Sequence, residues 1–172
     1  IAAGLTLSDL KHLADSENQP IIRVMPNINA QIGQSTSAIV KNEFVDDSAY
    51  ATVQEIFKST GSVHEIAEKD FSTFAAIAGS SPAFIYMFID AMARAGVLHG
   101  IPKDQATAIV AETVRASAEM ILQSGENPWS LVDKVSSPGG TTVAGVVSLE
   151  QNHFIGTVID AISATIEKEK NL

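Results

Sequence analysis

The spacing of apolar residues divides the chain near Glu68. Before that point, short apolar runs alternate with segments in which apolar residues recur every three or four positions. Such alternation is typical of strands that alternate with helices. The runs predict buried strands at residues 20–25 and 37–40 and a short strand at residues 62–66, and residues 1–3 fit the end of another. This order predicts the last part of a parallel α/β sheet.

Two helices are predicted between these strands. Thr6 or Ser8 can cap the first, a short one. Asp46 or Asp47 can cap the second, which is expected to end at Gly61. The expected buried face of this second helix consists of Ala49, Val53, Ile56 and Phe57.

The second part of the chain contains only helical periodicity. One helix is expected over residues 70–78, and Ser80-Ser81-Pro82 is a start signal for another. This other helix is apolar on nearly every side as far as Leu98, so it should be buried all round. A long amphipathic helix is expected from Pro102 to Gly125. The remaining helices are expected at residues 128–132, 141–151 and 154–168.

The apolar helix that ends at Leu98 has two candidate environments. The short length of this helix argues against a membrane span. Asp90 and Arg94, an i,i+4 pair of opposite charge, argue against it as well. A small domain has too few other elements to surround one helix on all sides. We therefore expect a partner subunit to cover it.

Residues 136–145 contain a loop, Ser-Ser-Pro-Gly-Gly, and the start of the helix expected at residues 141–151. The proline fixes one backbone angle, and the two glycines free the next positions from side-chain sterics. The first N–H groups of a helix have no partner within it, and the helix dipole favours negative charge there. The loop therefore suits a small anion, such as a carboxylate or phosphate. Hydroxyls that can assist are those of Ser136, Ser137, Thr141 and Thr142. The alternative is a tight loop with a Ser or Thr cap.

Composition and charge narrow the classes of partner. With 172 residues, 45% of them hydrophobic, the chain can form one ordinary domain, or one and a small piece, with a buried core. A net charge of −9 without any basic run argues against nucleic acid. The absence of cysteine excludes disulfides and thiolate metal sites and favours a cytoplasmic protein. The start shows no signal-peptide pattern and no Met, so we expect the C-terminal part of something longer.

Other catalytic patterns are missing from the sequence. The four histidines are scattered without metal-ligand spacing, and no nucleophile elbow occurs. Pro26 and Asn27 follow a buried strand, the place where open α/β sheets bind ligands, so they are candidates to line a cofactor crevice. Ala2-Ala3-Gly4 is a second candidate, and an ordinary loop is the alternative at both places. The Gly-x-Gly fingerprint of dinucleotide pyrophosphate sites does not occur.

Four sequence blocks, in this order, carry a resemblance to a known family. They are Ala2-Ala3-Gly4, Arg23-Val24-Met25-Pro26-Asn27, Gly79-Ser80-Ser81-Pro82-Ala83-Phe84 and Val135-Ser136-Ser137-Pro138-Gly139-Gly140-Thr141-Thr142. Over its whole length the chain resembles the C-terminal portion of the pyrroline-5-carboxylate reductases. It lacks their N-terminal glycine-rich loop. It also departs at Ser81 and Phe84, where Gly and Tyr are common, which weakens any role for a tyrosine hydroxyl there.

The resemblance implies a reduction of the C=N bond of pyrroline-5-carboxylate to L-proline that depends on NADPH or NADH. The implied fold is α+β and mostly α-helical. Residues 1–67 would be the C-terminal remnant of a Rossmann-type domain, and residues 68–172 an all-α dimerisation and substrate-binding domain. The substrate carboxylate would be held by Ser137, Gly139, Gly140, Thr141 and Thr142. The cofactor would be faced by Ala2, Ala3, Pro26 and Asn27. The hydroxyl of Thr142 is expected to assist protonation of the ring nitrogen.

Two other functions remain open at this point. The chain alone could be a non-catalytic dimerisation module, because it lacks the phosphate-binding loop. It could also belong to another dehydrogenase with a helical C-terminal domain, such as one acting on hydroxy acids, although the loop at residues 136–145 argues against that. By itself the chain is expected to dimerise and to bind NADPH weakly or not at all. The sequence leaves open the choice between a dimer and a ring of dimers, and between NADPH and NADH.

Overall fold

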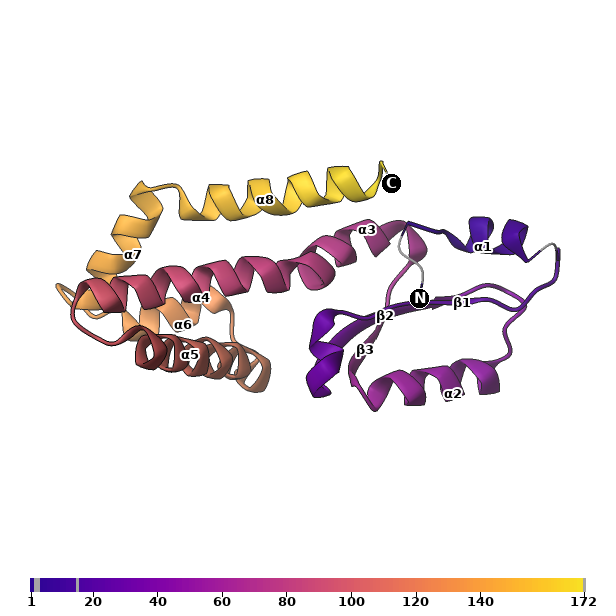
Figure 1. The fold of residues 1–172 in the computed structure, drawn as a ribbon, viewed down its shortest axis with the longest axis horizontal. Helices are drawn as coiled ribbons and strands as arrows, with labels where there is room; N and C mark the ends of the chain where they lie inside the picture. Colours follow the sequence, from indigo (N-terminus) through magenta and orange to yellow (C-terminus); the bar gives the residue numbers. More distant parts are fainter. Residues whose placement is uncertain (2–3, 15, 172) are drawn as a thin grey trace. The chain divides into compact units, whose positions relative to one another are not determined.

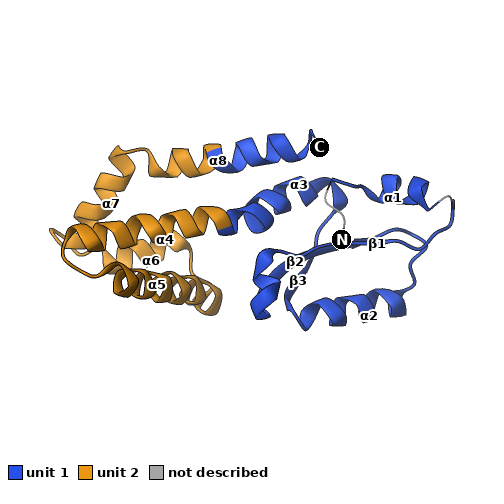
Figure 2. Ribbon diagram, viewed as in Figure 1, with its two compact units in different colours: residues 1–82, 161–172 blue, residues 83–160 orange. Residues whose placement is uncertain are grey.

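The fold is described from a computed structural model that covers residues 1, 4–14 and 16–171 (Figure 1). The chain divides into two compact units, which are described separately (Figure 2). The first unit consists of residues 1–82 and 161–172, and the second of residues 83–160. The predicted residues Ala2 and Ala3 lie outside the described residues.

The first unit contains a three-stranded sheet in the order β1-β2-β3. The strands are β1 (Ile22–Met25), β2 (Ser35–Lys41) and β3 (Gly61–Glu65), close to the three predicted runs. β2 and β3 are parallel, but β1 is antiparallel to β2, so the expectation of a parallel sheet is wrong for β1. The reason lies in the connection: residues 26–34 are too few for a parallel crossover, which needs about a dozen or more. They form only a short 3₁₀ turn, η1 (Ile28–Ile32).

Two helices of this unit begin at the predicted caps. α1 (Leu7–Leu13) starts at Thr6, whose Oγ1 accepts the N–H of Asp9 at 3.1 Å while the Asp9 carboxylate accepts the N–H of Thr6 at 2.8 Å. This reciprocal pair is a capping box. α2 (Asp47–Lys58) starts at Asp46, whose carboxylate accepts the N–H of Ala49 at 2.8 Å.

The prediction for α2 was wrong in three details. Ala49 is exposed and Ile56 is 58% exposed, and Tyr50 lies on the buried face beside Val53 and Phe57. The buried face therefore follows the spacing i, i+3, i+7 from Tyr50. The helix ends at Lys58, and Gly61 opens β3 instead of ending α2.

The sheet has a hydrophobic cluster on each face. On one face Val24, Ile39, Val45 and Tyr50 pack together, with α2 contributing its apolar stripe. On the other, Ala38 packs against Phe71 and Phe74 of α3 (Phe71–Phe74). Figure 1 shows α2 and α3 on opposite sides of the strands. Ala38 and Ile39 are adjacent in β2 and point to opposite faces, as the two-residue period of a strand requires.

Helical conformation is continuous from Glu68 to Leu98, in place of the two helices expected there. It begins with η2 (Glu68–Asp70) and α3, passes through a π-helical segment, η3 (Ala75–Ser80), and continues as α4 (Ser81–Leu98). Pro82 therefore lies inside the helix and does not start a new one. By length and composition alone, this 31-residue helix could cross a membrane.

The second unit is all helical among its described residues. After Ala83 of α4 it contains α5 (Lys103–Ser124), α6 (Pro128–Val135), α7 (Thr141–Gln151) and the first part of α8 (Phe154–Glu169). Pro102 and Gly125 bound α5 as predicted, Gly125 with a left-handed φ of 65°. In the single chain, α4 leaves large apolar side chains between 38% and 80% exposed. These are Ile85, Tyr86, Met87, Phe88, Met92, Val97 and Leu98. The described residues of the second unit therefore do not supply the cover expected for α4.

Candidate functional site

The loop between α6 and α7 forms a tight turn at Ser137-Pro138-Gly139-Gly140. The N–H of Gly140 donates to the carbonyl oxygen of Ser137 at 2.9 Å, and Gly139 has φ 69°. Proline at the second position and glycine with positive φ at the third are the features of a type II turn. The sequence therefore encodes this turn residue by residue.

Gly140 favours the turn in a different way, through close packing. A Cβ atom on Gly140 would lie 2.5 Å from Ser137 Oγ and 3.0 Å from the Ser137 carbonyl oxygen. Gly140 is also the N-cap of α7, and no side chain caps this helix. The alternative of a Ser or Thr cap is therefore wrong. Instead, the backbone of the turn ends directly at the first N–H groups of α7.

The turn brings together the residues predicted to bind a carboxylate. The first three N–H groups of α7, those of Thr141, Thr142 and Val143, have no acceptor within the helix. Among the described residues, the buried Oγ of Ser136 also has no hydrogen-bond partner. Backbone donors at a helix start favour an anion through both hydrogen bonds and the helix dipole. The predicted carboxylate-binding residues are therefore contiguous, and apart from the half-buried Gly140 they are exposed to solvent.

The end of β1 forms a second candidate site, within the first unit. A small pocket of about 190 Å³ lies there. It is lined by Ile1, Val24, Met25, Pro26, Ala75, Gly79, Ser80 and Glu169. The predicted cofactor residue Pro26 is therefore in a pocket wall, opposite residues of the π-helical segment. The predicted residues Ala2 and Ala3 are not described, so their place relative to this pocket stays a prediction.

Asn27, also predicted to face a cofactor, uses its side chain within the protein. Its Nδ2 donates to the carbonyl oxygen of Ala78 at 3.0 Å. Its Oδ1 accepts the N–H of Asn29 at 3.1 Å and, at 3.4 Å, that of Thr36. Its backbone N–H donates to Ser35 Oγ at 3.2 Å. Asn27 is therefore held by several segments of the same unit.

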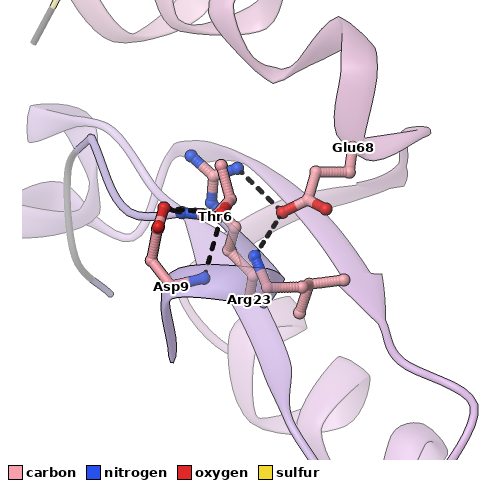
Figure 3. A network of polar contacts seen from close by, with 5 residues as sticks. Thr6, Asp9, Arg23 and Glu68 are labelled. Atoms are coloured by element: carbon pink, nitrogen blue, oxygen red, sulfur yellow. Dashed lines mark hydrogen bonds and ion pairs between the residues drawn. The ribbon is translucent and has the colours of Figure 1, made fainter. Parts of the chain in front are cut away.

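A polar network that sequence reasoning did not single out lies beside this strand end. Glu68 Oε1 accepts the N–H of Leu7 at 2.6 Å and pairs with Arg23 Nη1 at 3.3 Å (Figure 3). Arg23 is only 7% exposed, and its Cζ lies 4.4 Å from the ring centroid of Phe71. The sequence does carry one sign of this network, an arginine in an otherwise apolar strand. A cation that is buried with the strand requires a partner of opposite charge. Glu68 thus joins the start of α1, the strand β1 and the start of the long helix.

Loss of this carboxylate should destabilise the first unit. Glu68→Ala leaves the Arg23 guanidinium buried without its partner, and we expect a loss of about 2 kcal/mol of unfolding free energy, reduced from the fully buried case because Glu68 is 31% exposed. Urea unfolding followed by circular dichroism measures it. The double variant Arg23→Met, Glu68→Ala should lose less than Glu68→Ala alone, because no buried charge remains. Glu55→Gln, in the exposed pair with Lys58, is the matched control and should change stability by less than about 0.5 kcal/mol. Equal losses of unfolding free energy in Glu68→Ala and Glu55→Gln would contradict the role of Glu68 as the partner of the buried Arg23.

The remaining charged candidates form structural contacts. Asp90 pairs with Arg94 at 2.6 Å, as its i,i+4 spacing predicts, and also with Lys103 at 2.6 Å. The Lys103 ammonium and the Arg94 guanidinium hold the pKa of the Asp90 carboxyl below its ordinary value. Within the part of the chain that the structure describes, no three His, Asp or Glu side chains gather to hold a metal ion.

The three-stranded sheet and the helices that follow it correspond to the C-terminal part of a Rossmann-type α/β domain joined to an all-helical domain. Residues 68–172 match the family model described as pyrroline-5-carboxylate reductase dimerisation. The chain belongs to this family, and the resemblance seen in the four sequence blocks is confirmed.

Relatives and solved structures agree with this assignment. The chain is 40% identical over 172 residues to a pyrroline-5-carboxylate reductase of Aquifex aeolicus and 41% identical to that of Escherichia coli strain K12. All of the chain is aligned in both comparisons, and it spans 64% of the length of each relative.

A crystal structure of 1-pyrroline-5-carboxylate reductase from Streptococcus pyogenes superposes with a TM-score of 0.94 at 47% identity, over 99% of this chain and 66% of the other. The Plasmodium falciparum pyrroline carboxylate reductase, whose crystal structure has NADP bound, gives a TM-score of 0.92 at 36% identity, over 98% and 68%.

Proposed function

We propose that the gene product containing this chain reduces the C=N bond of 1-pyrroline-5-carboxylate to L-proline with NADPH or NADH, as a step of proline biosynthesis. The observation that carries the proposal is the turn at residues 137–140, which ends at the uncapped start of α7 in a chain of this family. We also propose a cytoplasmic location, which the lack of cysteine in the sequence favours. A reductase of this kind uses the cofactor for the hydride, and the protein orients the substrate and excludes water.

The carboxylate of the substrate is held by Ser137, Gly139, Gly140, Thr141 and Thr142. The free N–H groups of α7 donate to its oxygens, and the helix dipole stabilises its charge. This contact fixes the position of the carboxylate and leaves the five-membered ring only the rotation about the bond that joins it to the carboxyl carbon. The turn is thus an anchor that limits where the imine carbon can lie.

The cofactor is faced by Ala2, Ala3, Pro26 and Asn27. Bound NADPH or NADH supplies the hydride that the imine carbon accepts, while the ring nitrogen gains a proton. The pocket at the end of β1 suits the nicotinamide side, because Val24, Met25 and Pro26 offer it apolar surface. Residues 1–67 complete the cofactor-binding domain, and residues 68–172 form the helical domain for the substrate and for dimerisation.

A second copy of the chain covers the apolar surface of the helical domain, giving a homodimer or a larger ring of dimers. The exposed apolar side chains of α4 support this proposal, because isolated soluble domains rarely expose so many large apolar residues together. An apolar groove of about 760 Å³ between α5 and α6, lined by residues such as Met120, Ile121 and Leu131, supports it as well. In this arrangement the apolar character of the helix at residues 68–98 serves a protein partner and not a membrane.

The activity is tested with the complete gene product. We expect NADPH or NADH to be oxidised only when 1-pyrroline-5-carboxylate is present, with L-proline as the product. A complete protein that dimerises but neither binds cofactor nor forms proline would support the non-catalytic dimerisation module instead. Oxidation or reduction of hydroxy acids with no reaction of the imine would support the other class of dehydrogenase.

Thr142 is proposed to assist protonation of the ring nitrogen through its hydroxyl. Thr142→Val keeps the shape but loses the hydroxyl, and we expect kcat to fall about 10²-fold with KM nearly unchanged. Thr142→Ser retains the hydroxyl and should keep most of the activity. Thr52→Val, on the exposed face of α2, is a control for the substitution itself. Steady-state kinetics decide: unchanged turnover with only a raised KM in Thr142→Val would remove the protonation role and leave a binding role.

A further inference from the structure

Pro82 creates an unusual position inside a continuous helix. A residue in an α-helix donates its N–H to the carbonyl four residues earlier, which for residue 82 is the carbonyl of Ala78. Proline has no N–H, so this helical bond cannot form. The carbonyl of Ala78 is instead the acceptor of the Asn27 side chain, at 3.0 Å. The adjacent carbonyl, that of Ile77, accepts the hydroxyl of Ser81 at 2.6 Å.

The helix also departs from α geometry just before Pro82. Residues Ala75–Ser80 form the π-helical segment η3, a feature often found at functional sites. Gly79 and Ser80 of this segment line the pocket at the end of β1, opposite Met25 and Pro26. The wider helical turn and the carbonyl that Pro82 leaves free therefore both lie where one wall of this pocket is formed.

Asn27 connects the two walls of the pocket. It follows Met25 and Pro26 directly in the chain, and its own backbone and side chain are fixed by the bonds to Ser35 and Thr36 of β2. Its Nδ2 reaches across to Ala78, the residue just before Gly79. One amide side chain thus sets the separation between the end of β1 and the π-helical segment.

We propose that Asn27 is a positioning residue for the cofactor side of the site, and that Pro82 makes this role possible by leaving the Ala78 carbonyl without the α-helical donor from residue 82. The Asn27 side chain acts through the walls of the pocket, Pro26 on one side and Ser80 on the other, and not through its own contact with the cofactor. The inference rests on the proposed function for the identity of the cofactor. The bond between Asn27 and Ala78 itself does not depend on that function.

A double-mutant cycle separates this role from direct contact. In the complete gene product, Asn27→Ala should weaken NADPH binding about tenfold, because the carbonyl of Ala78 loses its donor and the pocket wall is released. Pro82→Ala restores an N–H at position 82, which can satisfy the same carbonyl. In the Pro82→Ala background, Asn27→Ala should therefore weaken NADPH binding by less than about threefold. The KM for pyrroline-5-carboxylate should change little in any of these variants.

Asn42→Ala is the matched control. Asn42 also bonds backbone groups at one end of β1, because its Oδ1 accepts the N–H of Ile21 at 3.1 Å and its Nδ2 donates to the carbonyl oxygen of Gln19 at 2.8 Å. Its loss should lower stability without changing the NADPH affinity, and its effect should be the same in the wild-type and Pro82→Ala backgrounds. If Asn27→Ala is poorly folded, Asn27→Ser retains an uncharged side-chain acceptor and removes the amide that donates to Ala78, and the same cycle applies.

Two measurements give the outcome, NADPH titration by fluorescence and urea unfolding. Non-additive effects of Asn27 and Pro82 in both, with additive effects of Asn42, would support the proposal. Equal losses of NADPH affinity from Asn27→Ala in the two backgrounds would overturn it in favour of direct contact. Additive unfolding free energies would overturn it whether or not the protein is active. An inactive wild-type protein that still shows coupling in unfolding would count against the proposed function alone.

Discussion

Gly140→Ala is expected to lower kcat/KM for pyrroline-5-carboxylate about 10²-fold, since a displacement of about 1 Å in an anchoring group can cost that much. The added Cβ would lie 2.5 Å from Ser137 Oγ and 3.0 Å from the Ser137 carbonyl oxygen. The Ser137 hydroxyl can rotate away from the added Cβ, but the Ser137 carbonyl oxygen accepts the Gly140 N–H, so the turn must shift to relieve the backbone contact. The first N–H groups of α7 would no longer point to one place.

The loss should appear mainly as a raised KM, with the fold preserved. Steady-state kinetics and circular dichroism of the complete gene product measure both. Gly156→Ala is the matched control, because a Cβ at that position of α8 meets nothing within 4 Å. If Gly140→Ala kept wild-type kinetics, the turn at residues 137–140 would not be the anchor of the substrate carboxylate.

Gly61→Ala should destabilise the first unit by about 4 kcal/mol or more, at the high end of single substitutions. Gly61 has φ 147°, and a Cβ there would lie 2.0 Å from the carbonyl oxygen and 2.4 Å from the nitrogen of Ser35. These are backbone atoms of β2, so no side-chain rotation can relieve the contact. Gly61 pairs with Ser35 in the parallel register of β2 and β3, so the strands must separate where they begin.

Urea unfolding followed by circular dichroism tests this expectation, with a low yield of soluble protein as the extreme form of the same result. Ser62→Ala is the control, because Ser62 is the exposed neighbour in β3 and loses only a long contact of 3.4 Å to Ser35. It should change stability by less than about 0.5 kcal/mol. A loss below about 1 kcal/mol in Gly61→Ala would mean that β2 and β3 do not pair in this register.

The helices of the second part were predicted closely because their boundaries depend on local chemistry. Pro102 and Gly125 bound α5, and α7 occupies the predicted residues 141–151. The turn before α7 was also predictable, since Pro138 and Gly139 encode its backbone angles. In these segments, each residue and its near neighbours in sequence determine the structure.

Two of the differences from the predictions come from contacts between distant segments, and a third comes from the length of one connection. Ser80-Ser81-Pro82 is a good helix start on local grounds, yet the helix continues through it with Asn27, 51 residues away in sequence, bonding the free carbonyl of Ala78. Arg23 and Glu68 are 45 residues apart, so no local pattern connects them. The reversal of β1 followed from the length of its connection, which the apolar pattern of the strands does not encode.

The sequence by itself determined the order of strands and helices, the turn that prepares the start of α7, and the family of the chain. These features depend on backbone preferences and side-chain periodicity, which act over a few residues. Only the tertiary structure decided that Asn27 reaches Ala78, that Glu68 joins α1 to β1, and that Tyr50 takes the buried place expected for Ile56. Such contacts depend on which surfaces meet after folding. A single sequence does not show which residues far apart in the chain will be in contact.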